Sequence, residues 1–205
     1  MPASSPASEI AVRLVAEADL PTRWARFRIL GFAATSAGAT PEEAVVLRLG
    51  ALTAAPLLRI HSQCLTGDVF ASLRCDCRQQ LELALETIAA AGSGLLLYEQ
   101  KEGRGIGLMN KLRAYALQDQ GADTVEANRQ LGFAADERDY AFPAAVLRHL
   151  GVRQVRLLSN NPDKIAALER AGIRVVERLP CQPAPASEAR EYLRVKKEKL
   201  GHLLR

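Results

Sequence analysis

Three cysteines, Cys64, Cys75 and Cys77, are the residues of this chain whose type and spacing point most directly to chemistry. We expect the pattern C-x10-C-x-C to place one thiol at the end of a strand and two on a tight turn. Three thiolates can then converge on one tetrahedral metal ion, and thiolate sulfur suits zinc. Because three protein ligands leave the fourth position for water, this set indicates catalytic rather than structural zinc.

Two other interpretations of these cysteines stay open. A closed structural zinc site needs a fourth protein ligand, for which Cys181 and His61 are the candidates. Alternatively, Cys75 and Cys77 form a redox pair, or the thiols bind no metal. The spacing favours catalytic zinc over both.

A second candidate site is the glycine-rich run EGRGIGL, residues 102–108. It follows an expected strand and precedes an expected helix, where backbone N–H groups and the helix dipole can bind phosphate. Neither the dinucleotide fingerprint nor the Walker loop is matched, but Arg104 can bind phosphate with two parallel hydrogen bonds. The alternative is an ordinary strand-to-helix turn followed by a solvated basic helix that contains Lys111 and Arg113.

A third candidate site is the run GFAADERDYAF, residues 132–142, which contains Asp136, Glu137, Arg138 and Asp139. A carboxylate within hydrogen-bond reach of a water or hydroxyl can act as a general base, and the arginine can orient it or bind phosphate. The alternative is the charged start of a helix, in which the acids complement the helix dipole.

The composition is that of a globular protein of 205 residues, with 48% hydrophobic and 24% charged residues, so we expect one domain. The net charge of +4 suits an anionic small substrate, and the low aromatic content of 5% argues against a nucleic-acid partner. No apolar run approaches the roughly 20 residues of a membrane span, and the first residues lack the pattern of a secretory signal. We therefore expect a cytoplasmic protein with reduced thiols and no membrane partner.

Alternating hydrophobicity and turn signals predict the elements that position these residues. Residues 25–32, 44–50 and 56–62 are expected to form an antiparallel sheet that delivers His61 to Cys64 at its edge. Further strands are predicted at 94–100, 155–159 and 173–178, and helices at 79–90, 108–120 and 161–172. Gly92 and Gly94 are expected to end the first helix, whose apolar face carries Leu81, Leu85 and Ile88; Asn160 or Asn161 is expected to cap the third, with Pro162 as its first residue.

This succession of strands and helices predicts an α/β (α+β) fold, a mixed sheet with flanking helices in a single domain. We expect an N-terminal tail at 1–8, a catalytic domain at 9–180, and a C-terminal linker and helix at 181–205. The stretch 180–187, rich in Pro, Ala and Ser, is expected to lie outside the core.

Taken together, the motifs resemble GTP cyclohydrolase II, the zinc enzyme that opens the imidazole ring of GTP at the start of riboflavin synthesis. The resemblance extends over residues 59–180 and is carried by HSQCLTGD, LRCDC, QQLE, EGRGIGLMNKLRAYALQDQG, DTVEANRQLGFAADERDY and LLSNNPDK. Because these motifs are long and occur in order, they are jointly far more specific than any one glycine loop or cysteine pair.

The resemblance implies a role for each matching residue. Cys64, Cys75 and Cys77 would hold the zinc, with Asp136 as the base, Arg138 as the nucleophile and Tyr115 as a further active-site residue. It also implies Mg²⁺ on the triphosphate, a homodimer, and release of formate and pyrophosphate from GTP. The implied nucleotide contacts are Arg59, Ile60, His61, Ser62, Gln63, Gln80, Glu102, Gly103, Arg104, Thr124, Ser159 and Lys164.

Three positions depart from the usual family pattern: Gln63 stands in place of glutamate, Arg78 in place of glycine and Ser159 in place of threonine. Two alternative functions therefore stay open. One is a relative that stops at the formamidopyrimidine or acts on another purine nucleotide, and the other is a non-catalytic nucleotide-binding protein with a structural zinc. Retention of all the implied catalytic and zinc-binding residues argues against the second.

Overall fold

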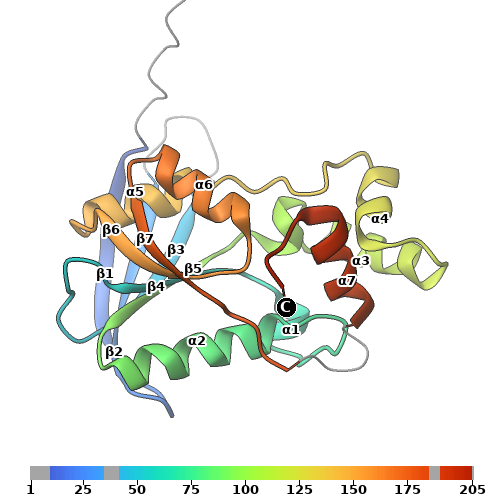
Figure 1. Cartoon of the computed structure of the whole chain (residues 1–205). Helices are drawn as coiled ribbons and strands as arrows, with labels where there is room; N and C mark the ends of the chain where they lie inside the picture. The colour runs from blue at the N-terminus through green and yellow to red at the C-terminus, as the bar shows by residue number, and fades with distance from the viewer. Residues whose placement is uncertain (1–9, 35–41, 185–189, 205) are drawn as a thin grey trace, which may run out of the picture.

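The computed structural model describes residues 10–34, 42–184 and 190–204. Its strands form a seven-stranded sheet in the order β1-β2-β3-β5-β4-β6-β7 (Figure 1). The strands are β1 Val12–Pro21, β2 Arg26–Ala34, β3 Glu43–Leu49, β4 Leu57–Ser62, β5 Gly94–Glu99, β6 Gln154–Leu158 and β7 Arg174–Leu179. The helices are α1 Leu65–Asp68, α2 Cys77–Ala91, the 3₁₀ turn η1 Glu102–Gly105, α3 Leu108–Asp119, α4 Thr124–Gln130, α5 Ala141–His149, α6 Pro162–Arg170 and α7 Arg190–Leu200.

The sheet has an antiparallel half and a parallel half. β1, β2, β3 and β5 pair antiparallel, whereas β5, β4, β6 and β7 pair parallel. The predicted antiparallel pairing is correct for β2 with β3 but wrong for β4, which lies between β5 and β6. Because α2 connects β4 to β5 as a crossover, the two strands must be parallel, and β4 is buried on both faces as a central parallel strand is.

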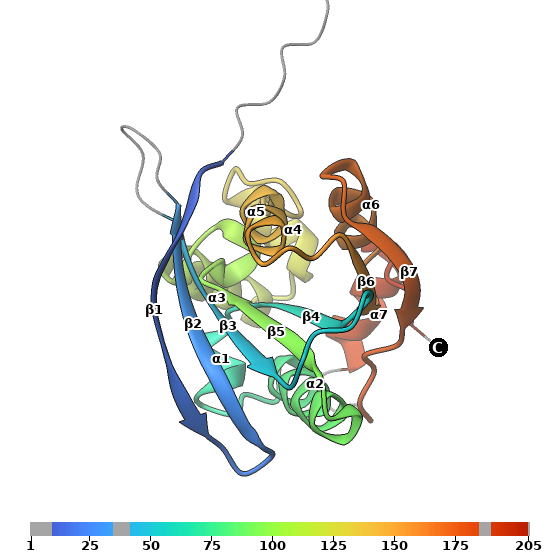
Figure 2. The same ribbon diagram turned by 90° about the vertical axis from the view of Figure 1, so that its left-hand side faces the viewer.

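Helices cover both faces of the sheet, as Figure 2 shows. α2 packs on one face, where Ala84, Leu85 and Ile88 meet apolar residues of β4, β5 and β6. α5 and α6 cover the other face through a larger cluster that includes Phe142 and Leu168. The predicted α/β fold, a mixed sheet with flanking helices in one domain, is therefore confirmed.

The predicted end of α2 and the predicted start of α6 are both confirmed. α2 ends at Gly92, whose left-handed backbone (φ 66°) favours glycine. Asn161 caps α6 by accepting a hydrogen bond from the Asp163 backbone N–H at 2.9 Å, and Pro162 begins the helix. The charged residues 136–139 are not part of a helix, because α5 begins only at Ala141. The expected alternative of a charged helix start is therefore wrong.

Two segments differ from what the sequence suggests. β1 was not predicted, because most of its side chains are exposed and leave no buried alternation to detect. The expectation that 180–187 lies outside the core is wrong for Cys181, which is fully buried beside α2. Its backbone exchanges two hydrogen bonds with the Asn160 amide, at 2.8 and 3.1 Å, and these hold the segment in place. The predicted tail at 1–8 and positions 185–187 lie outside the described residues.

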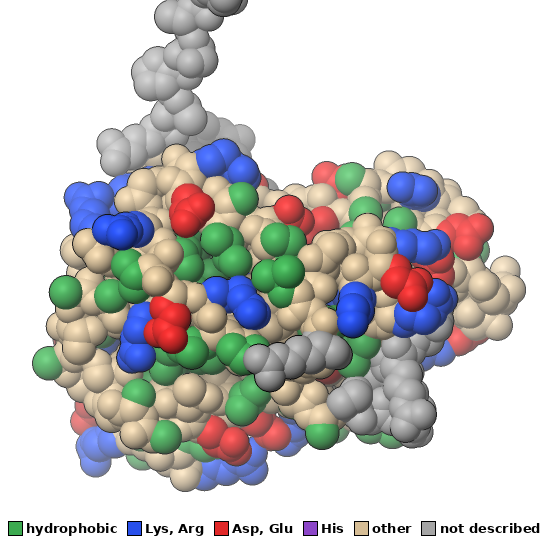
Figure 3. Space-filling model, viewed as in Figure 1, with side chains coloured by type: hydrophobic (Ala, Val, Ile, Leu, Met, Phe, Trp, Pro, Cys, Tyr) green, Lys and Arg blue, Asp and Glu red, His purple; other side chains and the backbone are tan. Residues whose placement is uncertain are grey.

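The helices α1, α3, α4 and α7 gather beyond the carboxyl ends of β4 and β5 (Figure 1). In a sheet with parallel strands this edge is the usual place for a ligand. On the face drawn in Figure 3, basic and acidic side chains lie interspersed, with no large basic patch. None of the helices within the described residues has the length and apolar character to cross a membrane.

Candidate active site

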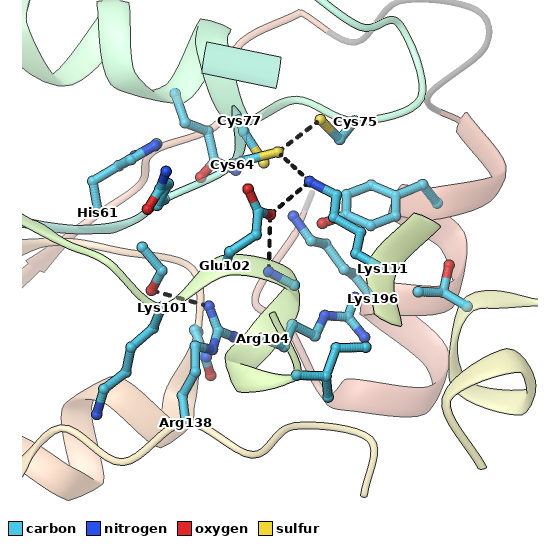
Figure 4. A pocket seen from close by; sticks show the side chains of 18 of the residues that line it. His61, Cys64, Cys75, Cys77, Lys101, Glu102, Arg104, Lys111, Arg138 and Lys196 are labelled. Carbon is cyan, nitrogen blue, oxygen red and sulfur yellow. Dashed lines mark hydrogen bonds and ion pairs between the residues drawn. The ribbon is translucent and has the colours of Figure 1, made fainter. Parts of the chain in front are cut away.

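A pocket opens at this edge of the sheet, and positive charge dominates its lining (Figure 4). The only acidic side chain in the lining, among the residues that the structure describes, is Glu102. Such a surplus of positive charge in a cleft attracts anionic ligands. The basic residues of the lining are Arg59, Arg74, Lys101, Arg104, Lys111, Arg138, Lys164 and Lys196.

The three cysteines of the predicted metal site meet in this pocket. Cys64 follows β4, Cys75 precedes α2, and Cys77 is the first residue of α2. Their sulfur atoms all lie within 4.8 Å of one another, and the Cys64 and Cys75 sulfurs are 3.7 Å apart. Tetrahedral zinc with Zn–S bonds of about 2.3 Å places its sulfurs roughly 3.8 Å apart, so the cluster fits this ion.

The proposed fourth ligands of a closed site lie elsewhere. Cys181 does not line the pocket, and its thiol donates to the Gln80 carbonyl oxygen in the first turn of α2 at 3.6 Å. The His61 ring contacts Asp68 through Nε2 at 3.1 Å and stacks on Tyr98. Within the described residues, the group that can hold a metal therefore consists of three cysteines. The arrangement favours the open site over the closed structural one.

Lys111 on α3 joins the cysteines to the glycine loop. Its Nζ donates to the Cys64 sulfur at 3.1 Å and to Glu102 Oε1 at 2.7 Å (Figure 4). Hydrogen bonds from the Cys75 and Cys77 thiols, together with the Lys111 charge, hold the pKa of Cys64 well below its usual range. The resulting thiolate raises the pKa of Cys75 to about 11. Lys111 thus offsets negative charge where a metal-binding thiolate must form.

The glycine-rich loop and the charged loop pack against each other. Arg104 adopts a left-handed backbone (φ 61°), which is strained for a residue with a side chain. A Cβ at Gly105 would lie 3.1 Å from Glu137, and the Glu137 N–H donates to the Arg104 carbonyl oxygen at 3.0 Å. Glycine is therefore needed at position 105 for the approach of the charged loop. The loop brings Glu102, Gly103 and Arg104 into the pocket lining.

Arg138 reaches the pocket from the charged loop, the segment 132–142 that contains Asp136, Glu137, Arg138 and Asp139. Asp136 pairs with Arg138 but does not itself line the pocket. The guanidinium donates to both carboxylate oxygens of Asp136, with Nε at 2.8 Å from Oδ1, and to Ser62 Oγ at 3.3 Å. Burial by itself would raise the pKa of Asp136 and lower that of Arg138. The ion pair outweighs burial, so the pKa of Asp136 is lowered and that of Arg138 is raised. Arg138 lines the pocket and Asp136 does not. The pair therefore presents a fixed positive charge to a ligand.

Tyr115 on α3 lies on the side of the pocket near the cysteines. Its hydroxyl is 3.2 Å from the Thr66 hydroxyl, and Thr66 Oγ1 is 3.7 Å from the Cys64 sulfur. The Arg74 guanidinium stacks on the ring at 4.8 Å. Burial raises the pKa of Tyr115, so the hydroxyl keeps its proton at neutral pH and can donate it.

Most of the nucleotide contacts implied by the resemblance line the pocket: Arg59, His61, Ser62, Gln63, Gln80, Glu102, Gly103, Arg104, Thr124, Ser159 and Lys164. Ile60 does not, because its side chain is fully buried in the core. Its carbonyl oxygen instead accepts from Lys164 Nζ at 2.8 Å. Burial, together with the charges of Arg59 and Arg138, lowers the pKa of Lys164 well below its usual value. A negative ligand would relieve this crowding of positive charge.

Comparison with known proteins identifies the family. The family model of GTP cyclohydrolase II matches residues 13–180. The chain belongs to the GTP cyclohydrolase II family. It is 54% identical to GTP cyclohydrolase-2 of Escherichia coli and to that of Cronobacter sakazakii, over 94% of this chain and 98% of each relative. The prediction of an enzyme of the GTP cyclohydrolase II type is thus confirmed.

Two further matches are to longer proteins. A riboflavin biosynthesis protein of Vibrio vulnificus is 53% identical over 94% of this chain, which spans 52% of that protein. A crystal structure of a two-domain 3,4-dihydroxy-2-butanone 4-phosphate synthase from A. baumannii aligns with a TM-score of 0.48 and 18% identity. That alignment covers 84% of this chain and 40% of the other.

Several lining residues were not predicted as part of the GTP cyclohydrolase II-like site. By sequence, both Lys111 and the lysines of α7 resemble the solvated surface of a basic helix. The available signal was the i, i+4 spacing of Tyr192 and Lys196, which puts both on one helix face. The unpredicted lining residues are Arg74, Lys101, Ile106, Lys111, Ala114, Gln118, Asn128, Asn160, Asn161, Tyr192, Lys196 and His202.

Proposed function

We propose that this protein catalyses the first step of riboflavin biosynthesis. It would open the imidazole ring of GTP, release formate and pyrophosphate, and give 2,5-diamino-6-(5-phospho-ribosylamino)pyrimidin-4-one. The observation that carries the proposal is the meeting of three cysteines that could hold a metal with eight basic side chains in one pocket of a GTP cyclohydrolase II family member. Such a pocket can hold a triphosphate and a hydrolytic metal together.

Zinc is the metal we assign to Cys64, Cys75 and Cys77, where it would supply a Lewis acid that makes water nucleophilic near neutral pH. The protein's own contribution is to keep the Cys64 thiol ionised and the three sulfurs close together. Lys111 offsets the charge of the Cys64 thiolate, and Glu102 fixes Lys111 while its Oε2 accepts from the Leu65 backbone N–H at 2.6 Å. Tyr115 lies beside the cluster with a protonated hydroxyl, so it is suited to donate a proton to the opening ring.

The phosphates would bind at the opposite, basic part of the pocket. Arg104, Arg138 and Lys164 converge there from three separate segments. Negative charge on a triphosphate would compensate the crowding that lowers the pKa of Lys164. Mg²⁺, which we also propose, would share the charge of the leaving pyrophosphate.

For Arg138, the geometry supports phosphate orientation better than attack on phosphorus. A guanidinium must lose its proton to become a nucleophile, and the paired Asp136 raises its pKa further. Because both Asp136 oxygens already bind Arg138, a role as a free general base is also less favoured than one in positioning. We therefore propose that Arg138 binds the α-phosphate and that Asp136 holds Arg138.

One experiment tests the proposal. The purified protein, with zinc and Mg²⁺ measured, is incubated with GTP, and formate, pyrophosphate and product mass are determined separately. We expect formate and pyrophosphate in equal amounts and the deformylated product. Release of neither compound by a zinc-loaded protein would refute the proposed function.

A second candidate is a reaction that stops at the formyl-retaining product, and Gln63 is the observation that favours it. This neutral residue lines the pocket next to Cys64, where the family usually has a carboxylate. A formyl-retaining product from the natural chain, converted to the deformylated one by Gln63→Glu, would support this candidate. An unchanged deformylated product in both forms would exclude it.

The homodimer implied by the family resemblance and the cytoplasmic location expected from the sequence stay predictions. So do the proposed boundaries at 8 and 180. The pocket lining includes Tyr192, Lys196 and His202 from the C-terminal segment, which supports counting that segment with the catalytic unit.

A further inference from the structure

Four side chains form a continuous chain of hydrogen bonds from α7 to β4, along one wall of the pocket. Lys196 Nζ donates to Asp76 Oδ1 at 3.0 Å, and Asp76 Oδ2 accepts from Gln80 Nε2 at 2.5 Å. Gln80 Oε1 in turn accepts from Arg59 Nη2 at 2.6 Å. Lys196, Asp76 and Arg59 are all buried. The chain therefore joins residues 120 positions apart in a fixed arrangement.

This arrangement determines which way round the Gln80 amide lies. A carboxylate paired with a lysine only accepts hydrogen bonds, and a guanidinium only donates them. The amide NH₂ must then face Asp76 and the amide oxygen must face Arg59, because the reverse orientation would lose both bonds. Arg59 is itself fixed by a bond from Nη1 to the Leu158 carbonyl oxygen at 3.0 Å.

Gln80 keeps hydrogen-bonding capacity for a ligand. An amide has two N–H donors and two acceptor lone pairs. Asp76 takes one of the N–H donors of Gln80, and Arg59 takes one of its lone pairs. Gln80 lines the pocket and is half-buried, so the remaining N–H and lone pair are available there. The pocket thus meets a ligand with a donor and an acceptor side by side, in a fixed order.

Purine bases differ in this order. A 6-oxopurine presents an acceptor at O6 beside a donor at N1–H, whereas a 6-aminopurine presents a donor at N6 beside an acceptor at N1. When phosphates and ribose are held elsewhere, the base meets the amide in one orientation only. A freely rotating amide would suit either base, but an amide of fixed order suits one.

We propose that Gln80 is the residue that selects 6-oxopurines over 6-aminopurines, and that Asp76 and Lys196 are positioning residues that fix the order of its amide. The proposal rests on the proposed function in taking the ligand to be a purine nucleotide. Lys196 acts by engaging the second oxygen of Asp76, so that the carboxylate cannot turn away from Gln80. The C-terminal helix, by its sequence a solvated surface helix, thereby becomes part of substrate selection.

The test compares the binding of two nucleotides that differ only at this edge of the base. The α,β-methylene analogues of ITP and ATP cannot release pyrophosphate, and their dissociation constants are measured by calorimetry on the zinc-loaded protein. We expect the natural chain to prefer the ITP analogue by about tenfold or more. With the ATP analogue, both hydrogen bonds to the amide are replaced by a donor–donor and an acceptor–acceptor contact. Asp76→Asn, whose amide can turn to accept or donate, should bring this ratio toward one.

Lys196→Met should also lower the preference for the ITP analogue, whereas Lys196→Arg should keep it, because arginine still carries a positive charge that can engage Asp76. Lys197→Met is the matched control, because Lys197 is an exposed lysine of the same helix, and it should leave the ratio unchanged. If these residues had only a structural role, their substitution would weaken the binding of both analogues equally. Equal weakening in Asp76→Asn and in Lys196→Met, or a natural ratio near one, or no binding of either analogue, would overturn the proposal.

This readout is independent of the proposed catalysis. A protein that releases no formate from GTP but shows the expected ratios would refute the proposed function and support the selection by Gln80. A protein that releases formate but shows no dependence of the ratio on Asp76 or Lys196 would do the reverse.

Discussion

Gly67→Ala should weaken zinc binding, because Gly67 packs directly against the three cysteines of the cluster. A Cβ at this position would be 2.9 Å from the Cys75 sulfur, 3.1 Å from the Cys64 sulfur and 3.1 Å from Cys77 Cβ. Ordinary van der Waals contact begins at about 3.5 Å, so three neighbours would have to move. Two of these are sulfurs whose separation the metal requires.

The expected magnitude follows from where the strain is felt. Overpacking by one methyl group costs about 1–3 kcal/mol in a well-packed site. Without metal the thiols can spread apart, whereas Zn–S bonds of about 2.3 Å would hold them against the new methyl. The cost therefore lies mostly in the zinc-bound state, and we expect zinc to bind roughly 5- to 150-fold more weakly.

The assay is competition for zinc against a chromophoric chelator of known affinity. Gly67 is in α1 and has no left-handed backbone, so alanine there should if anything favour the helix, by about 0.5–1 kcal/mol. Gly92→Ala is the control: it is strained by its φ of 66° but has no atom within 4 Å of the added Cβ. It should lose stability and keep its zinc affinity. Natural zinc affinity in Gly67→Ala would refute the proposed geometry of the metal site.

Three further outcomes are expected. Serine at any of the three cluster cysteines should remove zinc, whereas Cys181→Ser should keep it; zinc loss in Cys181→Ser, measured by metal analysis, would mean a closed four-ligand site. Asp136→Asn should keep zinc but raise the KM for GTP at least as strongly as it lowers kcat, because the Arg138 guanidinium loses the carboxylate that holds it. A fall in kcat alone, by about 10²–10⁴-fold, would instead indicate that Asp136 is a general base. Stability should fall as the pH drops from about 6.5 toward 3, because burial lowers the pKa of His202 to about 3 and an unfolded histidine binds its proton near 6.5. His202→Gln should flatten this dependence in denaturant unfolding at pH 7, 5 and 4, and an unchanged slope would show that other groups cause it.

The sequence by itself determined the local parts of the site. The cysteine spacing, the glycine-rich run and the charged loop each lie in one short segment. α2 and α6 were predictable because periodic apolar residues and end signals such as Gly92 and Asn161 act within a few residues of the chain. The order of the motifs was enough to indicate the family.

Only the tertiary structure decided what these residues contact. The resemblance implies a base at Asp136 and a nucleophile at Arg138, but only the fold shows that the Asp136 carboxylate is paired with the Arg138 guanidinium and that Ser62, 76 residues away, contacts the same guanidinium. Lys196 has the appearance of a solvated lysine, yet it is buried on Asp76, and Cys181 is core despite its proline-rich surroundings. The physical reason is that charge and polarity in a sequence do not say whether a side chain will be solvated. That depends on which distant segments the crossover connections of the sheet bring together, and no local period encodes those contacts.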